Sequence, residues 1–90
     1  MKPENEHYLL KKGNCLKSLK KYDEAINCFN KLIQMNPTGN SDAYYLKGVC
    51  LIETKNYREA LKLFEKALEI EPNNQTFLKK KNLTQQILNS

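Results

Sequence analysis

The pattern of hydrophobic and polar positions predicts pairs of short amphipathic helices. Hydrophobic residues recur every three or four positions, which is the spacing of one face of an α-helix. The clearest run is repeated 35 residues further along the chain. The two runs are Ala25, Ile26, Phe29, Leu32 and Ile33, and then Ala60, Leu61, Phe64, Ala67 and Leu68. Each run predicts a helix that buries one side, and the repetition predicts two similar units.

Prolines and turn-forming residues indicate where these helices end. Pro37 and Pro72 cannot donate a backbone hydrogen bond, and each disfavours a helical conformation in the residue before it. The second helix of each unit should therefore end just before its proline. The linker at residues 36–42, NPTGNSD, is rich in turn formers, and we expect Asn40 or Ser41 to be the N-cap of the next helix.

Each unit begins with another helical stretch, and each of these stretches contains a glycine. Gly13 and Gly48 are 35 residues apart, and a glycine inside a helix costs about 1 kcal/mol relative to alanine. A close contact with the partner helix would offset this cost. The partner helices present Ala25 and Ala60. We therefore expect each glycine to face an alanine, with the phenylalanine that follows filling the space beyond.

The duplicated segment resembles the tetratricopeptide repeat (TPR), a helix–turn–helix unit of about 34 residues with the pattern W-x₂-L-G-x₂-Y…A-x₃-F…P. The matching positions, in the order of the pattern, are Leu9 and Tyr44 for Trp, Gly13 and Gly48, Leu16 and Leu51 for Tyr, Ala25 and Ala60, Phe29 and Phe64, and Pro37 and Pro72. Lys12 and Lys47 depart from the usual leucine. The resemblance covers about residues 4–74 and implies an all-α fold, a right-handed α-solenoid of two helical hairpins.

We expect a single TPR domain over residues 1–90. Its first repeat should cover about 6–39 and its second about 41–74. Residues 75–88 have one modest hydrophobic side and no second helix, as a C-terminal capping helix requires. Two repeats and a cap lie near the minimum of about three repeats for independent stability, so the chain is expected either to dimerise or to belong to a longer array.

Composition adds a location and excludes several classes of protein. Charged residues make up 28% of the chain and hydrophobic residues 40%, which is typical of a soluble globular protein. No hydrophobic run approaches the roughly 20 residues that span a bilayer. The N-terminus does not resemble a signal peptide. The sequence therefore favours a cytoplasmic protein that does not enter the membrane.

Cysteine and histidine usage argues against a metal site. The three cysteines, Cys15, Cys28 and Cys50, lack C-x-x-C spacing, and His7 is the single histidine. We expect all three cysteines to be small buried hydrophobic residues. No P-loop, G-x-G-x-x-G or H-E-x-x-H motif is present, and the carboxylates are scattered. The sequence therefore predicts neither a catalytic residue nor a cofactor, and indicates that the protein is not an enzyme.

The resemblance implies a scaffold-like function in protein binding, because the first helices of TPR hairpins line a concave groove that commonly receives a peptide or helix. Helical projection predicts that eleven residues line this groove: Leu10, Lys11, Asn14, Lys17, Tyr45, Leu46, Val49, Ile52, Lys79, Lys80 and Leu83. The net charge is +5. A ligand with hydrophobic anchors and acidic flanks would suit such a groove.

Several other interpretations of these residues remain open. The hydrophobic strip could be covered by the capping helix or by a second copy of the chain in a homodimer, or it could be ordinary solvated surface. A basic helical repeat could instead bind nucleic acid, although few aromatic residues lie among the lysines. Nucleic acid is therefore the less favoured ligand.

Some TPR proteins bind the C-terminal carboxylate of heat-shock chaperones through a clamp of Lys, Asn, Asn, Lys and Arg. The positions of such a clamp, by resemblance, are Leu10, Asn14, Leu46, Thr76 and Lys80. Only Asn14 matches, and Lys80 supplies a cation in place of arginine. Because a terminal carboxylate needs several converging charged donors, this set predicts a poor clamp.

Overall fold

Five α-helices follow one another along the chain in the computed structural model, which describes the backbone of residues 3–90 and the side chains of residues 5–90. The helices are α1 (Pro3–Ser18), α2 (Tyr22–Met35), α3 (Ser41–Glu53), α4 (Tyr57–Ile70) and α5 (Gln75–Asn89). Residues 3–90 contain no strand. None of these helices has the length and hydrophobicity needed to span a membrane. The prediction of an all-α fold is confirmed.

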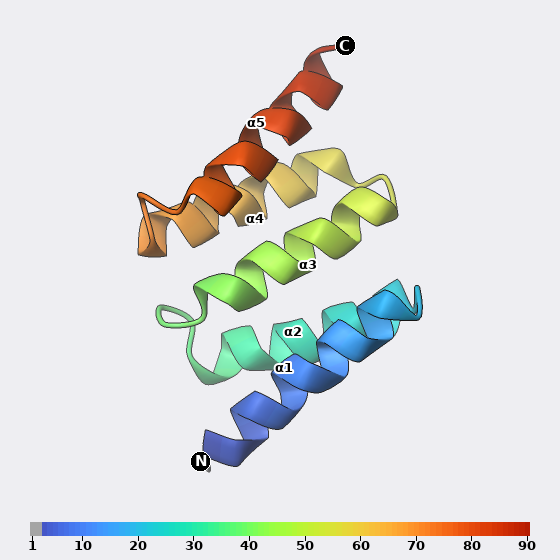
Figure 1. The fold of residues 1–90 in the computed structure, drawn as a ribbon, viewed down its shortest axis with the longest axis vertical. Coiled ribbons are helices and arrows are strands. Elements are labelled where there is room, and N and C mark those ends of the chain that lie inside the picture. The colour runs from blue at the N-terminus through green and yellow to red at the C-terminus, as the bar shows by residue number, and fades with distance from the viewer. Residues whose placement is uncertain (1–2) are drawn as a thin grey trace.

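The helices form two layers that build up along one direction (Figure 1). Helices α1, α3 and α5 lie on the viewer's side in Figure 1, and α2 and α4 lie behind them. Each helix packs mainly against its neighbours in the sequence, and α1 and α3 touch only slightly. The two ends of the chain lie at opposite ends of the longest dimension, which is 43 Å. This arrangement is the α-solenoid expected from the repeat.

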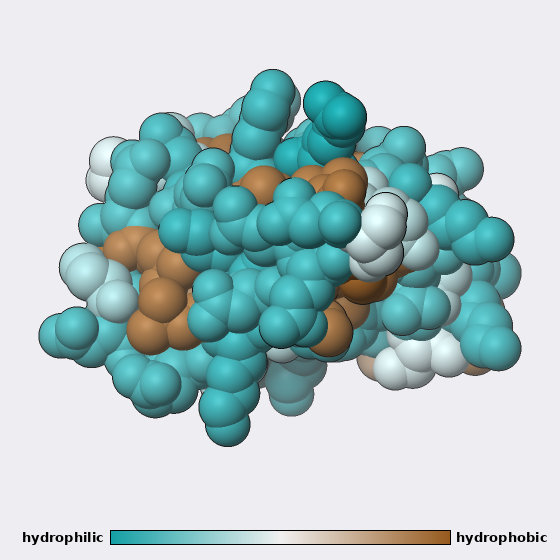
Figure 2. All heavy atoms as spheres, turned by 90° about the horizontal axis from the view of Figure 1, so that it is seen from above, coloured by the Kyte–Doolittle hydropathy of each residue, from teal (hydrophilic) through white to brown (hydrophobic). Residues whose placement is uncertain are grey.

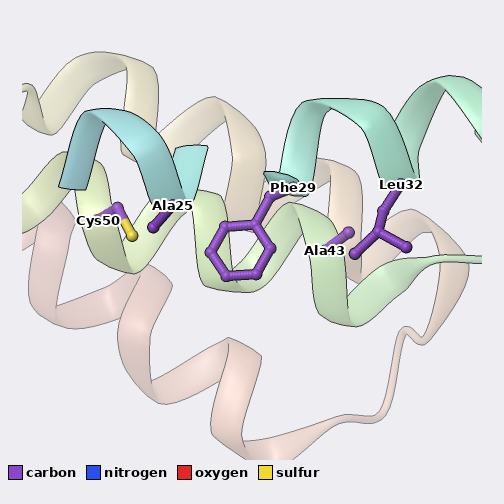
Figure 3. Packing of buried hydrophobic residues seen from close by; sticks show 5 residues of the cluster. All are labelled: Ala25, Phe29, Leu32, Ala43 and Cys50. Atoms are coloured by element: carbon purple, nitrogen blue, oxygen red, sulfur yellow. The ribbon is translucent and has the colours of Figure 1, made fainter. Parts of the chain in front are cut away.

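A hydrophobic core lies at every junction between helices. Between α2 and α3, the side chains of Ala25, Phe29 and Leu32 pack against Ala43 and Cys50 (Figure 3). Two further clusters hold the second hairpin and α5 together. They consist of Leu51, Ala60 and Phe64, and of Tyr44, Ala67 and Phe77. The core is therefore continuous along the solenoid although each helix contacts few others.

Both helical glycines lie at crowded contacts, as predicted, but the neighbour is different. A Cβ atom on Gly13 would lie 2.6 Å from Cε1 of Phe29, and one on Gly48 would lie 2.7 Å from Cε1 of Phe64. Both distances are well below van der Waals contact. The expectation of glycine against alanine was wrong, because the phenylalanine ring itself fills the space next to each glycine.

The linker between the hairpins is fixed by side-chain hydrogen bonds. Helices α2 and α4 end at Met35 and Ile70, before the prolines, as expected. Asn40 lies at the N-cap position of α3 but makes no capping hydrogen bond. Its Nδ2 instead donates to the carbonyl of Leu32 at 2.7 Å, near the end of α2. Ser41 is the first residue of α3, and its hydroxyl donates to Glu71. The prediction of an N-cap at Asn40 or Ser41 is confirmed in position by Asn40, although the Asn40 side chain does not cap the helix.

Helix α5 has the properties of a cap. Asn74 Oδ1 accepts a hydrogen bond from the backbone nitrogen of Phe77 at 3.1 Å and so begins the helix. Phe77 and Thr84 are buried, whereas Asn82 and Gln85 are exposed. Figure 2 looks onto this end of the molecule and shows a mostly hydrophilic surface with small separate hydrophobic areas. One side of α5 covers the second hairpin and the other faces water.

The cysteines differ in their environment. Cys28 and Cys50 are buried, as expected, but Cys15 is exposed. Cys15 and Cys50 occupy equivalent positions in the repeat, and α2 covers Cys50 while no described helix covers the same side of α1. The prediction for Cys15 was wrong because burial at this position depends on a preceding helix.

Candidate functional site

The predicted groove residues lie on α1, α3 and α5, and we call the surface that these helices form the α1–α3–α5 face (Figure 1). The structure does not make them equally accessible. The partly buried members are Leu10, Asn14, Lys17, Tyr45, Leu46, Val49, Ile52 and Lys80, and the exposed members are Lys11, Lys79 and Leu83.

Two of the four hydrophobic residues predicted on α3 contribute mainly to packing between repeats. The Tyr45 ring lies 5.7 Å from the Phe64 ring and 5.0 Å from the Phe77 ring, measured between centroids. Burial raises the pKa of the Tyr45 hydroxyl. Leu46 packs against the cluster between α2 and α3. The core of a single hairpin does not require these two hydrophobic side chains. They are needed because they pack the hairpin against the neighbouring helices α2 and α5.

Val49 and Ile52 complete the hydrophobic part of the α1–α3–α5 face. Both pack against the cluster of Leu51, Ala60 and Phe64, and both remain partly exposed. Partly exposed hydrophobic side chains on a rigid helix can supply the anchoring contacts of a bound peptide. The hydrophobic centre of this face therefore lies on α3.

Lysines lie on the two helices that flank this centre. Lys17 on α1 lies close enough to Cys50 of α3 to affect its thiol electrostatically. Burial raises the pKa of the Cys50 thiol to about 11, and the positive charge of Lys17 opposes this rise. Lys79 and Lys80 on α5 form no ion pair with the side chains of residues 5–90. Lys81, in contrast, pairs with Glu65 of α4. Lysines that pair with no carboxylate among residues 5–90 thus lie on both sides of α3.

A cavity of about 360 Å³ lies where α1 and α3 begin, next to the linker between the hairpins. Its lining includes the carboxylates of Glu6, Asp42 and Glu71, together with His7 and Leu10. Hydrogen bonds from Ser41 and Asn74 lower the pKa of the Glu71 carboxyl. This end of the face is therefore acidic, a feature that the sequence reasoning missed because the three carboxylates come from separate segments. Asp42 in the first turn of α3 was the available signal.

Among the described residues, no three His, Cys, Asp or Glu side chains are placed to hold a metal ion. His7 is exposed beside the acidic cavity. This face presents partly exposed hydrophobic side chains on α3 and lysines on α1 and α5.

Consecutive antiparallel hairpins with glycine–phenylalanine contacts define a helical-repeat protein, and sequence comparison names the repeat. The tetratricopeptide repeat family matches residues 8–38 and 41–74. The chain belongs to this family. Comparison with curated protein sequences finds no significant match.

A solved structure supports the same fold. The chain is similar to the first TPR of Spaghetti (RPAP3) bound to HSP90 peptide SRMEEVD, with a TM-score of 0.64 and 23% sequence identity. The similarity covers 100% of this chain and 98% of the other. At this identity the similarity establishes the arrangement of the five helices, and the ligand of that structure remains a property of that protein.

Proposed function

We propose that the chain is a non-enzymatic protein-interaction module that binds a peptide or helix on the α1–α3–α5 face. The observation that carries the proposal is the order of chemistry across this face. Partly exposed Val49 and Ile52 occupy the middle, on α3, and Lys17 on α1 and Lys79 and Lys80 on α5 form no ion pair with the side chains of residues 5–90. A ligand that crosses the three helices would place hydrophobic anchors over α3 and acidic residues at both flanks.

The acidic cavity restricts where such a ligand can run. Glu6, Asp42 and Glu71 would repel an acidic flank at the start of α1 and α3. Lys17 lies in the last turn of α1, at the opposite end of the helix. The favoured path therefore crosses the later half of α1 and α3, over Lys17, Val49 and Ile52.

A terminal-carboxylate clamp is a second candidate, because the similar TPR structure holds the peptide SRMEEVD. The side chains at the corresponding positions here do not favour it. Leu10 and Leu46 both pack against the core between α2 and α3 and bring no donor. Asn14, Thr76 and Lys80 are the polar groups left at those positions, and only Lys80 brings a positive charge to an acidic terminus.

Two labelled peptides separate these candidates. One is SRMEEVD, compared with its C-terminal amide, and the other has a hydrophobic centre with acidic residues on both sides and an amidated C-terminus. We expect the second peptide to bind, and we expect amidation of SRMEEVD to change its affinity little. Selective binding of SRMEEVD with a free carboxylate would instead support the clamp.

Variants of the chain test the location of binding. Lys17→Glu should weaken binding of the second peptide about tenfold, because it replaces an attraction with a repulsion worth about 1.4 kcal/mol in total. The matched control is Lys66→Glu, a lysine of α4 whose side chain is 52% exposed. Fluorescence anisotropy measures the affinities, and circular dichroism checks the fold. Equal weakening by both variants would show that net charge, rather than this face, controls binding.

Two further measurements on the same protein samples test the alternatives of self-association and nucleic-acid binding. A mass of two chains in sedimentation equilibrium, with the Val49 region protected, would assign the face to a homodimer. Affinity for random RNA or DNA that falls steeply with salt would support nucleic-acid binding. We expect neither result at physiological salt.

A further inference from the structure

Helices α1, α3 and α5 have equivalent residue positions along the repeat. One side of α3 and α5 is covered by another helix, whereas the same side of α1 is exposed. Ala43 of α3 is 1% exposed and Phe77 of α5 is 2% exposed. The residue of α1 at the same register is Tyr8, which is 61% exposed. In α3 and α5 this side of the helix is covered by the helix that precedes it.

The same difference in exposure is found seven residues further along each helix. Cys50 and Thr84 are both fully buried, whereas Cys15 of α1 is exposed. Figure 3 shows how α2 covers this side of α3, with Phe29 lying between Ala43 and Cys50. We call the uncovered side of α1, carrying Tyr8, Lys12 and Cys15, the outer face of α1.

A lysine occupies equivalent positions in α1, α3 and α5. Its ion pair in α5 indicates that a helix bound to the outer face of α1 should bring a negative charge. Lys12, Lys47 and Lys81 occupy equivalent positions in α1, α3 and α5. Lys81 Nζ lies 4.0 Å from Glu65 Oε2, across the junction between α5 and its covering helix α4. Lys12 Nζ lies over the Tyr8 ring, 5.8 Å from its centroid. The outer face therefore offers Lys12 where the α4–α5 junction has an interhelical ion pair.

A groove extends the outer face toward α2. Its volume is about 530 Å³, and its lining consists of Asn5, Tyr8, Leu9, Lys31, Gln34 and Met35. Leu9, Met35 and the Tyr8 ring make it partly hydrophobic. The charged side chain in this lining is Lys31, and no carboxylate of residues 5–90 belongs to it.

We propose that the outer face of α1 binds an amphipathic helix of an acidic partner protein, laid on α1 as α2 lies on α3. The partner helix would cover Tyr8 and Cys15 with small and hydrophobic side chains. A carboxylate at the position of Glu65 in α4 would pair with Lys12, and further acidic residues would face Lys31. This surface is separate from the α1–α3–α5 face, so each can be occupied without the other.

Charge argues against a second copy of the chain as the occupant. Each copy carries a net charge of +5. Within each copy, the sides of α2 and α4 that cover a following helix are already used by α3 and α5. A copy would therefore bring α5, whose exposed surface includes Lys79, against the lysines of α1. Like charges would oppose this contact.

The chain supplies the template for a probe. The peptide consists of residues 22–35 with Asn30→Glu, since Asn30 occupies the position of Glu65, and with Cys28→Ser to remove its thiol. A side-chain staple away from the contact side keeps it helical, because so short a helix is marginal in isolation. We expect the peptide to shift amide signals of Tyr8, Lys12 and Cys15 in the intact chain. It should also slow modification of the Cys15 thiol by a disulfide reagent.

A charge exchange makes the test specific. Lys12→Glu should weaken the probe about tenfold through loss of the charged pair and the repulsion that replaces it. A probe with Asn30→Lys should bind this variant better than it binds the natural chain. Lys17→Glu, on the α1–α3–α5 face, serves as the control and should leave the probe's affinity within about twofold. The same control variant weakens ligands of the α1–α3–α5 face, so the two proposals can fail independently.

Three results would overturn the proposal. The first is the absence of signal changes at the outer face when the probe is in large excess. The second is equal binding of the Asn30→Glu and Asn30→Lys probes. The third is a concentration-dependent dimer of the free chain in which Cys15 is protected, because a second copy would then be the occupant.

Discussion

Gly48 lies under the edge of the Phe64 ring, which occupies the space that a methyl group would need. Phe64 is fully buried and cannot swing away. We expect Gly48→Ala to destabilise the fold by about 1–2 kcal/mol, because overpacking at so short a contact should cost about 2–3 kcal/mol, the upper part of the usual range, and better helix propensity returns about 1 kcal/mol. Urea unfolding followed by circular dichroism measures the change. In the Phe64→Leu background the same substitution should cost less. A Gly48→Ala chain as stable as the original would contradict the crowding.

Residue-level predictions from the sequence succeeded where they depended on spacing alone. The glycine, alanine and phenylalanine positions identify the contacting sides of the two helices in each hairpin. They do not fix how far one helix is displaced along the other, so spacing alone predicts Ala60 as the neighbour of Gly48, whereas the structure has Phe64 there. Cys15 was misjudged for another reason. A hydrophobic position becomes buried only if some element covers it, and the repeat pattern does not say whether the first helix has a neighbour.

The turns within the two hairpins hold a strained residue at the same place. Lys20 has a φ of 64° and Lys55 a φ of 67°, in the left-handed region that glycine adopts readily. Each turn is closed by backbone bonds, including one from the Asn56 nitrogen to the Leu51 carbonyl at 2.7 Å. The strain is therefore a property of this turn, imposed by the hydrogen bonds around it.

Relief of that strain should be measurable. We expect Lys55→Gly to stabilise the fold by about 0.5–1 kcal/mol, because glycine adopts positive φ without a Cβ clash. Lys62→Gly, in the exposed interior of α4, is the matched control and should destabilise by about 1 kcal/mol. Thermal unfolding of both variants provides the comparison. The interpretation fails if both substitutions lower the midpoint equally.

At the scale of whole helices, the sequence predicted type and order better than the details of the ends. Pro37 and Pro72 marked the ends of α2 and α4 because proline has a local effect. The start of α3 at Ser41 agrees with the predicted N-cap position, but the partner of the Asn40 side chain was not predictable, because its Nδ2 donates to the Leu32 carbonyl, a group eight residues earlier in the chain. Competition between a local cap and a more distant acceptor cannot be judged without the fold.

Across the molecule, the fold followed from the repeat, while the binding face followed only in part. Sequence projection placed the candidate residues on α1, α3 and α5, the helices that form one layer. It did not reveal that Tyr45 and Leu46 are committed to packing between repeats, or that Glu6, Asp42 and Glu71 gather at one end. Both features arise from contacts between elements that periodicity within one helix does not describe.

Stability should vary along the solenoid. Helices α2, α3 and α4 each have neighbours on both sides, whereas α1 and α5 lie at the ends. We expect amide hydrogen exchange to be slowest around Phe29, Cys50 and Phe64 and faster in α1 and α5, because the terminal helices can open without disrupting the central core. Mass spectrometry of peptic fragments measures this gradient. Uniform exchange over all five helices would show a single cooperative unit instead.

The end-to-end arrangement of the chain also has a mechanical consequence. The termini stand at opposite ends of the long axis, and helices that are not consecutive scarcely touch. A pull on the two termini therefore acts on one junction after another and detaches the outermost helix first. Under tension the molecule should unfold in several successive steps, one helix junction at a time, rather than in a single cooperative event.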